Sequence, residues 1–562
     1  MIKACSSRLA ALCLLLLAVG IARPGAAAPP PLSVYGNLPG FEMAALSPSG
    51  DRVALVGVVD GARRLLVVDK SNNALLGSAV GDKKVLAIEW AGEDKVLVRT
   101  SHTVELGSAF TADKAELSSM LVVPVSGQQP WAVFEDSNYL RGLIFGYRGV
   151  IEREGRWFGY FGRKTSAVFA TELYEVDLET RKAVRVAKSG DRGSSYNWLL
   201  GAAGEAVAFS DFYSWNGNWR IRGRNFKTLA SGTNPKGGIG LVSLGRTPGT
   251  IVYADQDEDT GEEHWYELPL SGGSPVELLA NEPVLAIHTD RRSRQLIGFV
   301  RDGDVPSDQF FDPRRNKIMA AARRAFPGLN VRLIDWSYSF ERLLVSTDGV
   351  GDPGTWWLVD IKTGKATDLG SSYPIKSSEV GPMRMFRYKA ADGLDVEGVL
   401  TLPPRSDAKK LPVVVLPHGG PWSRDYPGFD WMAQAFASRG YAVFQPNFRG
   451  STGYGVAFEK AGDGEWGRKM QTDISDGLAE LVRQGIVDGN RACIVGASYG
   501  GYAALAGVTL QQGMYRCAVS LAGISDVERL YSTWIKESGH DRTVRRWIHQ
   551  VIGKGRDLRS VS

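Results

Sequence analysis

Gly496-Ala497-Ser498-Tyr499-Gly500 lies near the end of a chain of 562 residues. A serine in the pattern Gly-x-Ser-x-Gly is typical of a nucleophile elbow, the strand-to-helix turn of an α/β-hydrolase. The apolar run Cys493-Ile494-Val495 precedes the pattern, and the small residues Gly501-Tyr502-Ala503-Ala504 follow it. Both flanks fit a buried strand that enters a closely packed helix. The stretch therefore predicts an α/β-hydrolase domain in which Ser498 is the nucleophile.

A second segment, Pro417-His418-Gly419-Gly420-Pro421, follows an apolar run from Leu411. Glycines after a buried strand free backbone N–H groups to face an oxyanion, and the N–H of the residue after the nucleophile is the complementary donor. We therefore predict an oxyanion hole formed by Tyr499 and Gly420, with Gly419 as a further candidate. His418 precedes the serine, which is the wrong chain order for the base in this fold, so a structural role is favoured.

The surrounding sequence alternates between strand and helix patterns. Strands are predicted at 411–417, 441–445 and 492–496, and helices at 431–439, 472–484 and 502–509. Such alternation is typical of a parallel sheet with helices on its faces. The glycine-rich stretch Asn447-Phe448-Arg449-Gly450-Ser451-Thr452-Gly453-Tyr454-Gly455 follows the second strand. No Lys-Ser/Thr pair follows it, so a structural loop beside the active site is favoured over phosphate binding.

The front half has a different organisation. From about residue 40 to 375, short β-type runs and turn signals dominate, and a strand-turn-strand unit recurs. The anchor positions of this repeat are Asp69, Pro124, Asp177, Arg224, Pro269, Asp312 and Asp360, with weaker copies at Arg224 and Asp312. Their spacing of about 43 to 55 residues is typical of a β-propeller. We predict about seven blades, with an all-β sandwich pair as the alternative.

The N-terminus has the pattern of a secretory signal. Lys3 and Arg8 precede an apolar run from Leu9 to Ile21, and the small residues 25–28 follow. This arrangement predicts residues 1–28 as a signal peptide, removed on export, and a secreted or periplasmic protein without a membrane anchor thereafter. Loss of the segment lowers the net charge from +5 to about +2, so the composition does not favour nucleic acid as a partner.

Two cysteines, Cys493 and Cys517, remain after removal of the signal. Both lie in apolar, strand-like runs. We expect buried free thiols, because adjacent strands seldom place two cysteines well for a disulfide, although an exported protein permits one. The length predicts two domains, a propeller at 29–375, whose first residues could pack on the hydrolase, and a hydrolase domain at 376–562.

Together, these segments resemble the prolyl oligopeptidase family of serine peptidases, in its dipeptidyl-peptidase and acylaminoacyl-peptidase branch. The similarity runs from about Leu411 to Asp526 and includes the two loops, the stretch Asp473 to Asp476 and the elbow. The resemblance implies a Ser-Asp-His triad at the domain interface, with Ser498 as nucleophile. It also implies short peptides as substrates, because the propeller restricts access, and no metal or organic cofactor. A homo-oligomer is left open.

The end of the sequence departs from this family. The family places its triad acid and histidine farther beyond the serine than residue 562. Asp526 matches a family aspartate outside the triad, and His540 and His549 come too early, around a charged stretch predicted as a surface helix. The resemblance therefore predicts that the triad Asp and His are not present in the chain. It also predicts a hydrolase domain incomplete at its C-terminus, and a fragment with residual activity.

Three functional hypotheses follow from these features. The first is a serine-type peptidase, an amino- or oligopeptidase that acts through an acyl-enzyme. The second is a carboxylesterase with the same triad, since the acyl-transfer chemistry is shared. The third is a non-catalytic propeller binding protein.

Overall fold

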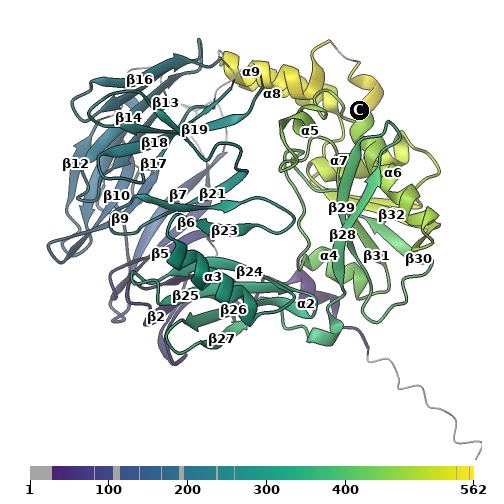
Figure 1. The fold of residues 1–562 in the computed structure, drawn as a ribbon, viewed down its shortest axis with the longest axis horizontal. Coiled ribbons are helices and arrows are strands. Elements are labelled where there is room, and N and C mark those ends of the chain that lie inside the picture. The colour runs from purple at the N-terminus through teal and green to yellow at the C-terminus, as the bar shows by residue number, and fades with distance from the viewer. Residues whose placement is uncertain are drawn as a thin grey trace, which may run out of the picture.

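The computed structural model describes residues 28–562 except 82, 106–113, 138–139, 166–167, 189–194, 236–237, 258–259, 540 and 556. The predicted signal peptide, apart from Ala28, lies outside the described residues. The described chain forms a β-propeller followed by an α/β domain (Figure 1). No helix in this described part is long and apolar enough to cross a membrane.

The propeller consists of seven antiparallel sheets, which confirms the predicted fold. Blades one to three are β1 (Phe41–Leu46), β2 (Arg52–Val59), β3 (Ala62–Asp69) and β4 (Ala74–Ala79); β5 (Lys84–Ala91), β6 (Lys95–Glu105), β7 (Lys114–Pro124) and β8 (Trp131–Ala132); and β9 (Tyr147–Arg153), β10 (Arg156–Thr165), β11 (Val168–Asp177) and β12 (Ala183–Ala187). Blades four and five are β13 (Ser195–Leu200), β14 (Ala206–Tyr213), β15 (Asn218–Gly223) and β16 (Thr228–Thr233); and β17 (Gly240–Leu244), β18 (Thr250–Gln256), β19 (Glu263–Pro269) and β20 (Val276–Leu278).

Blade six differs from the other blades because, in the described chain, it lacks a fourth strand. Blade six has three strands, β21 (Val284–Thr289), β22 (Leu296–Arg301) and β23 (Ser307–Phe310), and helix α3 (Pro313–Ala325) follows them. Asp312 caps this helix, since its side chain accepts a hydrogen bond from the Arg314 N–H. Blade seven is again four-stranded, with β24 (Leu329–Trp336), β25 (Arg342–Gly349), β26 (Asp352–Asp360) and β27 (Lys365–Ser371).

Each repeat anchor marks the end of the third strand of its blade. Asp69, Pro124 and Asp360, for example, are the last residues of β3, β7 and β26. The weak anchors follow β15 and β23 by one and two residues. At Asp312 the repeat is weak because a helix cap, rather than a hairpin turn, occupies that position.

The propeller core is divided into small clusters between neighbouring blades. In one of them, Trp219 and Ile221 of β15 pack against Leu241, Ile251 and Tyr253 of the next blade. The alternating burial of β15 shows why, because its apolar residues all point to one face. Each blade is therefore stabilised mainly by its two neighbours.

The second domain has one six-stranded sheet in the order β28-β29-β31-β30-β32-β33. The strands are β28 (Met383–Lys389), β29 (Asp395–Thr401), β30 (Leu411–Val415), β31 (Ala442–Asn447), β32 (Val487–Ala497) and β33 (Cys517–Leu521). The last four strands in this order pair in parallel, as predicted. The helices are α2 (Leu32–Gly36), α4 (Trp431–Ala437), α5 (Val456–Lys460), α6 (Lys469–Arg483), α7 (Tyr499–Thr509), α8 (Val527–Glu537) and α9 (Arg542–Ile548), with short turns at Ser377–Glu379, His549–Gly553 and Arg559–Val561.

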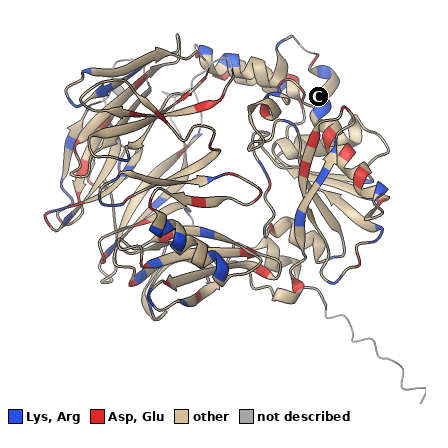
Figure 2. Ribbon diagram, in the orientation of Figure 1, with Lys and Arg blue, Asp and Glu red and all other residues tan. Residues whose placement is uncertain are grey.

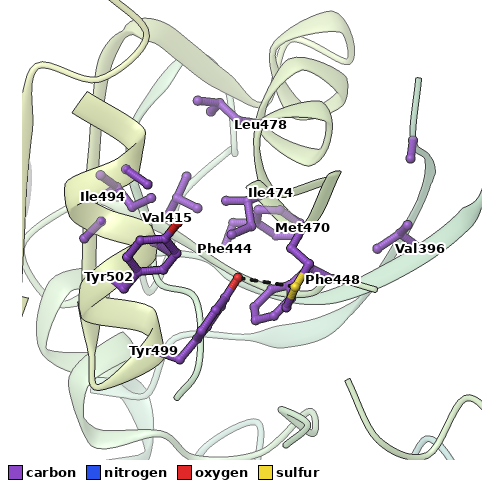
Figure 3. Packing of buried hydrophobic residues seen from close by; sticks show 14 of the residues in the cluster. Val396, Val415, Phe444, Phe448, Met470, Ile474, Leu478, Ile494, Tyr499 and Tyr502 are labelled. Atoms are coloured by element: carbon purple, nitrogen blue, oxygen red, sulfur yellow. Dashed lines mark hydrogen bonds between the residues drawn. The ribbon is translucent and has the colours of Figure 1, made fainter. Parts of the chain in front are cut away.

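Helices cover both faces of this sheet. Val413 and Val415 of β30 point into the core formed with α6 and α7, whereas Val414 packs on the opposite face against Ala433 of α4. Figure 3 shows part of the first of these cores, in which Ile474 and other buried side chains pack between the sheet and its helices. The period-two alternation of β30 therefore places buried residues on both faces.

The edge of the sheet contradicts one prediction. Cys493 and Cys517 form a disulfide, with their Cα atoms 4.7 Å apart, so the expected free thiols are wrong. The two residues lie directly opposite each other in the parallel pairing of β32 and β33. β33 is the outermost strand, and it leaves the side chains of Val519 and Leu521 exposed.

The two domains meet on one face of the propeller. The Asn330 amide donates a hydrogen bond to the carbonyl of Pro427 at 2.6 Å, and the Tyr426 hydroxyl donates to Asp302 at 2.9 Å. Thr543 of α9 donates to the carbonyl of Ser214 at 3.1 Å. Ser214 and Asp302 both lie in loops between the second and third strands of their blades. This propeller face therefore covers the hydrolase domain (Figure 1).

Candidate active site

The turn between β32 and α7 presents Ser498 on the surface of the sheet. Ser498 has φ 55° and ψ −120°, a conformation that is strained for a residue other than glycine. Its side chain is exposed, while α7 begins at the next residue. The positive end of the α7 dipole thus points toward any negative charge that develops beside the serine. This geometry is that of a nucleophile elbow.

The flanking glycines allow the elbow to close. A Cβ at Gly496 would collide with the backbone of Gly500, and a Cβ at Gly500 would collide with the carbonyl oxygen of Pro417. Strand, helix and the preceding loop therefore approach more closely than side chains would permit. This close packing is the steric reason why the motif has glycine at both positions.

The predicted oxyanion loop lies against the serine. A Cβ built on Gly419 would lie 3.5 Å from the Cβ of Ser498 and 3.3 Å from the carbonyl oxygen of Ala497. Gly420 follows with φ 121° and is exposed. The backbone of residues 419–420 and the N-terminus of α7, where Tyr499 lies, therefore border the same space beside Ser498. The structure thus places Gly419 directly against Ser498, with Gly420 and Tyr499 adjacent to these two residues in the chain.

The side chain of Tyr499 has a separate, structural role. It is fully buried, and its ring packs against Trp466 and Phe448 at centroid distances of 4.8 and 5.4 Å. Its hydroxyl lies 3.6 Å from the sulfur of Met470 (Figure 3). Burial raises the pKa of Tyr499 well above its usual range. The aromatic side chain anchors α7, so its backbone N–H is held in a fixed position.

His418 supports the oxyanion loop instead of serving as a base. Its Nδ1 donates to the carbonyl of Gly419 at 2.8 Å, and its Nε2 lies 2.9 Å from the hydroxyl oxygen of Ser451. The ring stacks on Phe448 at 4.5 Å. Burial lowers the pKa of His418 to about 4, so the imidazole is neutral near pH 7. Both ring nitrogens are engaged away from Ser498, which agrees with the structural role inferred from chain order.

The glycine-rich loop 447–455 braces the oxyanion loop from behind. Besides the contact of Ser451 with His418, the Thr452 N–H donates to the carbonyl of Ser423 at 3.1 Å. The side-chain amide oxygen of Asn447 accepts the N–H of Asp425 at 2.8 Å. These bonds fix the loop that carries Gly419 and Gly420, as the structural interpretation of this segment predicted.

An ion-pair network anchors the same loop in the core. Arg449 donates two side-chain hydrogen bonds to Asp473, at 2.7 and 2.6 Å, and two to Asp392, at 2.9 and 3.0 Å. Asp473 is completely buried on α6. The guanidinium and Lys469 hold the pKa of the Asp392 carboxyl well below its usual range. Sequence reasoning noted Asp473 as part of the resemblance, but only the structure identifies its partner.

The described histidine that follows the elbow in the chain does not lie beside Ser498. The Nδ1 of His549 lies 2.7 Å from the hydroxyl of Tyr531, in the helical region after the sheet. His540 lies outside the described residues. Asp526 caps α8 by accepting the Arg529 N–H at 2.7 Å. Within the described part of the chain, no histidine or carboxylate is hydrogen-bonded to the Ser498 hydroxyl, and no group of three or more His, Cys, Asp or Glu fits a metal ion.

A cavity of about 230 Å³ lies between the two domains, and its lining includes the aromatic residue that follows the oxyanion loop. Trp422 and Trp547 contact each other there, with ring centroids 4.9 Å apart, and Gln256 and Gly261 contribute from the propeller. Burial raises the pKa of Glu459, which also lines the cavity. Sequence reasoning missed this cavity because its lining comes from segments far apart in the chain.

Comparison with known proteins confirms the resemblance. Residues 427–550 match the prolyl oligopeptidase family. A dipeptidyl aminopeptidase BIII from Pseudoxanthomonas mexicana is 37% identical over 198 residues, which cover 34% of this chain and 29% of that protein. Dipeptidyl peptidase family member 6 from Caenorhabditis elegans is 32% identical over 223 residues, or 36% of this chain and 30% of that protein. The chain thus matches about 30% of the length of these two curated relatives.

Solved structures extend the likeness of fold to both domains. A puromycin-hydrolyzing peptidase from Mycobacterium tuberculosis superposes with a TM-score of 0.63 at 19% identity, covering 94% of this chain and 83% of its own. An acylaminoacyl peptidase from Pyrococcus horikoshii gives a TM-score of 0.63 at 16% identity, covering 94% and 84%. At these identities the likeness establishes the fold, a seven-bladed propeller joined to an α/β-hydrolase domain.

Proposed function

We propose that the protein carrying this chain is a serine-type peptidase that cleaves short peptides through an acyl-enzyme on Ser498. The observation that carries the proposal is the strained, exposed Ser498 at a helix N-terminus, with Gly419 directly against it. Attack of the Ser498 oxygen on a carbonyl develops negative charge on the carbonyl oxygen. The N–H groups of Tyr499 and Gly420 are the proposed donors to that oxygen.

The remaining chemistry follows from acyl transfer. The peptide amine leaves with a proton, and water then cleaves the ester to regenerate the hydroxyl. Both proton transfers need a base within hydrogen-bond reach of Ser498. Since His418 is neutral and turned away, we propose that a Ser-Asp-His triad is completed by residues other than those described around Ser498.

The substrate class follows from the covering domain. A propeller over the site limits the size of the chain that can reach it, and the interdomain cavity of about 230 Å³ is suited to one or two side chains. Trp422 and Trp547 are the aromatic part of a lining that also contains charged and amide side chains. These features support short peptides, rather than folded proteins, as substrates.

A fluorophosphonate probe tests the nucleophile in the whole gene product. We expect labelling of the native protein and of a Ser438→Ala control, and loss of labelling in Ser498→Ala. Ser438 is a suitable control because it caps the end of α4 in the same domain. Absence of labelling, or equal labelling of Ser498→Ala, would sink the proposal.

Substrate comparison then separates peptidase from esterase. We expect the native protein to hydrolyse aminoacyl or dipeptidyl anilides at least as well as simple p-nitrophenyl esters. Peptide turnover far below ester turnover would instead support a carboxylesterase. Labelling by the probe without turnover of either class would contradict a peptidase function.

We also propose that the protein is exported. The support is the N-terminal sequence, with Lys3 and Arg8 before an apolar run and small residues at 25–28. N-terminal sequencing of the native protein is expected to start near residue 28. Detection of the protein in the cytoplasmic fraction, with Met1 still at its N-terminus, would refute export.

A further inference from the structure

The propeller contains a second cavity, far from the elbow. It has a volume of about 330 Å³, and its lining comes from the inner strands of all seven blades or the loops that follow them. Pro48, Asp290 and Tyr338, for example, lie in loops between the first and second strands of their blades. The hydrolase domain contacts loops between second and third strands, which lie at the opposite ends of the blades. The cavity therefore opens at the end of the propeller axis that faces away from Ser498.

Two arginines line this cavity, and they differ in their partners. Arg291 forms an ion pair with Asp335 and donates a hydrogen bond to the carbonyl of Leu46 at 3.0 Å. Arg294 donates only to the carbonyl of Arg148, at 2.9 Å. Among the residues that the structure describes, Arg294 has no carboxylate partner, and its Nε is buried without a hydrogen bond.

The fold makes room for this unpaired guanidinium. A side chain at Gly149 would bring its Cβ within 3.2 Å of an Arg294 terminal nitrogen, and Gly149 has φ 92°. Burial of a cation without a counter-charge is costly, unless a ligand supplies one. Burial lowers the pKa of Arg294, and the nearby Glu89 opposes this shift only in part.

A neutral donor lies in the same cavity. The hydroxyl of Ser243 is buried without a hydrogen-bond partner within the described chain, and the residue is only 3% exposed. Ser243 lines the cavity, as does Arg294. A buried hydroxyl without a partner is destabilising, so its retention needs a reason. The two groups come from different blades, and both can donate to an oxyanion.

Two acidic groups, Asp290 and Glu89, also line the cavity, and Glu89 attracts Arg294 without a direct ion pair. Asp290 accepts hydrogen bonds from the backbone N–H groups of Arg292 and Ser293, at 3.0 and 2.8 Å. Glu89 accepts the Tyr147 hydroxyl at 2.7 Å. Burial raises the pKa of the Glu89 carboxyl, while Tyr147, Arg291 and Arg294 act in the opposite direction. The lining thus holds two arginines and two carboxylates, and in the described chain neither carboxylate forms an ion pair with Arg294.

We infer that this cavity binds a small molecule through a carboxylate or phosphate group, which pairs with the guanidinium of Arg294 and accepts a hydrogen bond from the hydroxyl of Ser243. The site is independent of the peptidase chemistry proposed above. A charged oxyanion can accept hydrogen bonds from both groups, whereas an uncharged ligand would leave Arg294 without a direct ion pair. The volume accommodates a ligand of metabolite size, larger than a bare ion.

Calorimetric titration of the native protein with inorganic phosphate and, separately, with succinate tests the site. We expect saturable binding of at least one anion. Ser243→Ala and Arg294→Gln are each expected to weaken it roughly tenfold or more, because each removes a hydrogen bond to a charged group. Arg314→Gln is the matched control, because it removes the same charge from an exposed arginine on the basic helix α3 (Figure 2).

A second measurement separates binding from folding. Without ligand, Ser243→Ala is expected to melt at the same temperature as the native protein or higher, because it removes an unsatisfied buried hydroxyl. Tighter binding of phosphate would identify a phosphorylated ligand, and tighter binding of succinate a carboxylate. Failure of both anions to bind, or unchanged affinity in both cavity variants, would overturn the inference.

Discussion

The propeller and the hydrolase domain bury their side chains in different ways. The propeller divides its core into clusters shared by two neighbouring blades, whereas the hydrolase domain gathers most of its buried residues into one core around a single sheet. In the hydrolase core, a loop that shapes the active site is attached directly to a buried ion network. In the propeller, Arg294 near the axis has a buried Nε without a hydrogen bond and forms no ion pair within the described chain. We therefore expect local effects of mutation in the propeller and domain-wide effects in the hydrolase.

The largest expected effect comes from Arg449→Met. This change leaves the fully buried carboxylate of Asp473 without its guanidinium, and loss of one partner of a buried pair costs about 3–5 kcal/mol. Denaturant titration followed by a signal of the hydrolase domain measures the loss. We expect oxyanion-loop function to fail with it, because Arg449 anchors the loop that braces His418.

Two controls sharpen this prediction. Arg483→Met removes an exposed pair with Glu480 on α6 and is expected to change stability very little. Arg222→Met acts in the propeller on the buried Asp211, which keeps Arg220 at 3.8 Å, and so is expected to cost less than Arg449→Met. Equal losses for Arg449→Met and Arg222→Met would break the proposed contrast between the domains.

The disulfide provides the next largest effect. It closes a loop with a sequence separation of 24 residues, and a loop of this size is worth about 3 kcal/mol by the chain-entropy argument. Replacement of Cys493 and Cys517 by alanine is therefore expected to lower the hydrolase transition and leave the propeller transition unchanged. Two resolved unfolding signals, one from each domain, measure this. A shift of both transitions by the same amount would mean that the domains unfold as one unit.

A smaller effect is expected from a single methyl group at the elbow. Gly500→Ala forces a Cβ against the carbonyl oxygen of Pro417, and such overpacking costs about 1–3 kcal/mol. Gly240→Ala in β17 of the propeller meets no atom within 4 Å and is expected to be neutral or slightly stabilising. Thermal unfolding and fluorophosphonate labelling compare the two variants. Normal labelling of Gly500→Ala would contradict the close packing described for the elbow.

The sequence predicted the parts of each domain that depend on local patterns. The repeat anchors located the third strand of each blade, and the glycine-serine motif located the strained turn at Ser498. It could not predict the disulfide, because only the register of β32 and β33 places Cys493 opposite Cys517. It could not predict the cavity at the propeller axis for a similar reason, since Ser243 and Arg294 come from different blades. Contacts between distant segments depend on register and closure, which no local pattern encodes.

The smallest effect concerns pH, and it is expected to have opposite signs in the two domains. Burial lowers the pKa of His418 to about 4 in the folded hydrolase, below the unfolded value near 6.5. The unfolded state therefore takes up the proton first, and hydrolase stability falls as pH drops from about 6.5 toward 4. Because the ring is only partly buried, we expect a loss of about 1–2 kcal/mol, which His418→Gln should remove.

In the propeller, His264 lies 2.8 Å from Glu277, and this hydrogen bond raises the pKa of the imidazole. Here the folded state binds the proton more tightly, so the contribution is present below pH 6.5 and is lost as pH rises through the folded pKa. The pair is largely exposed, so its effect is small. Denaturant titrations from pH 4 to 8 on His418→Gln and His264→Gln should therefore change the slopes of the two transitions in opposite directions. If both substitutions changed the pH dependence of the unfolding free energy in the same direction, the two imidazole environments would not differ as the structure indicates.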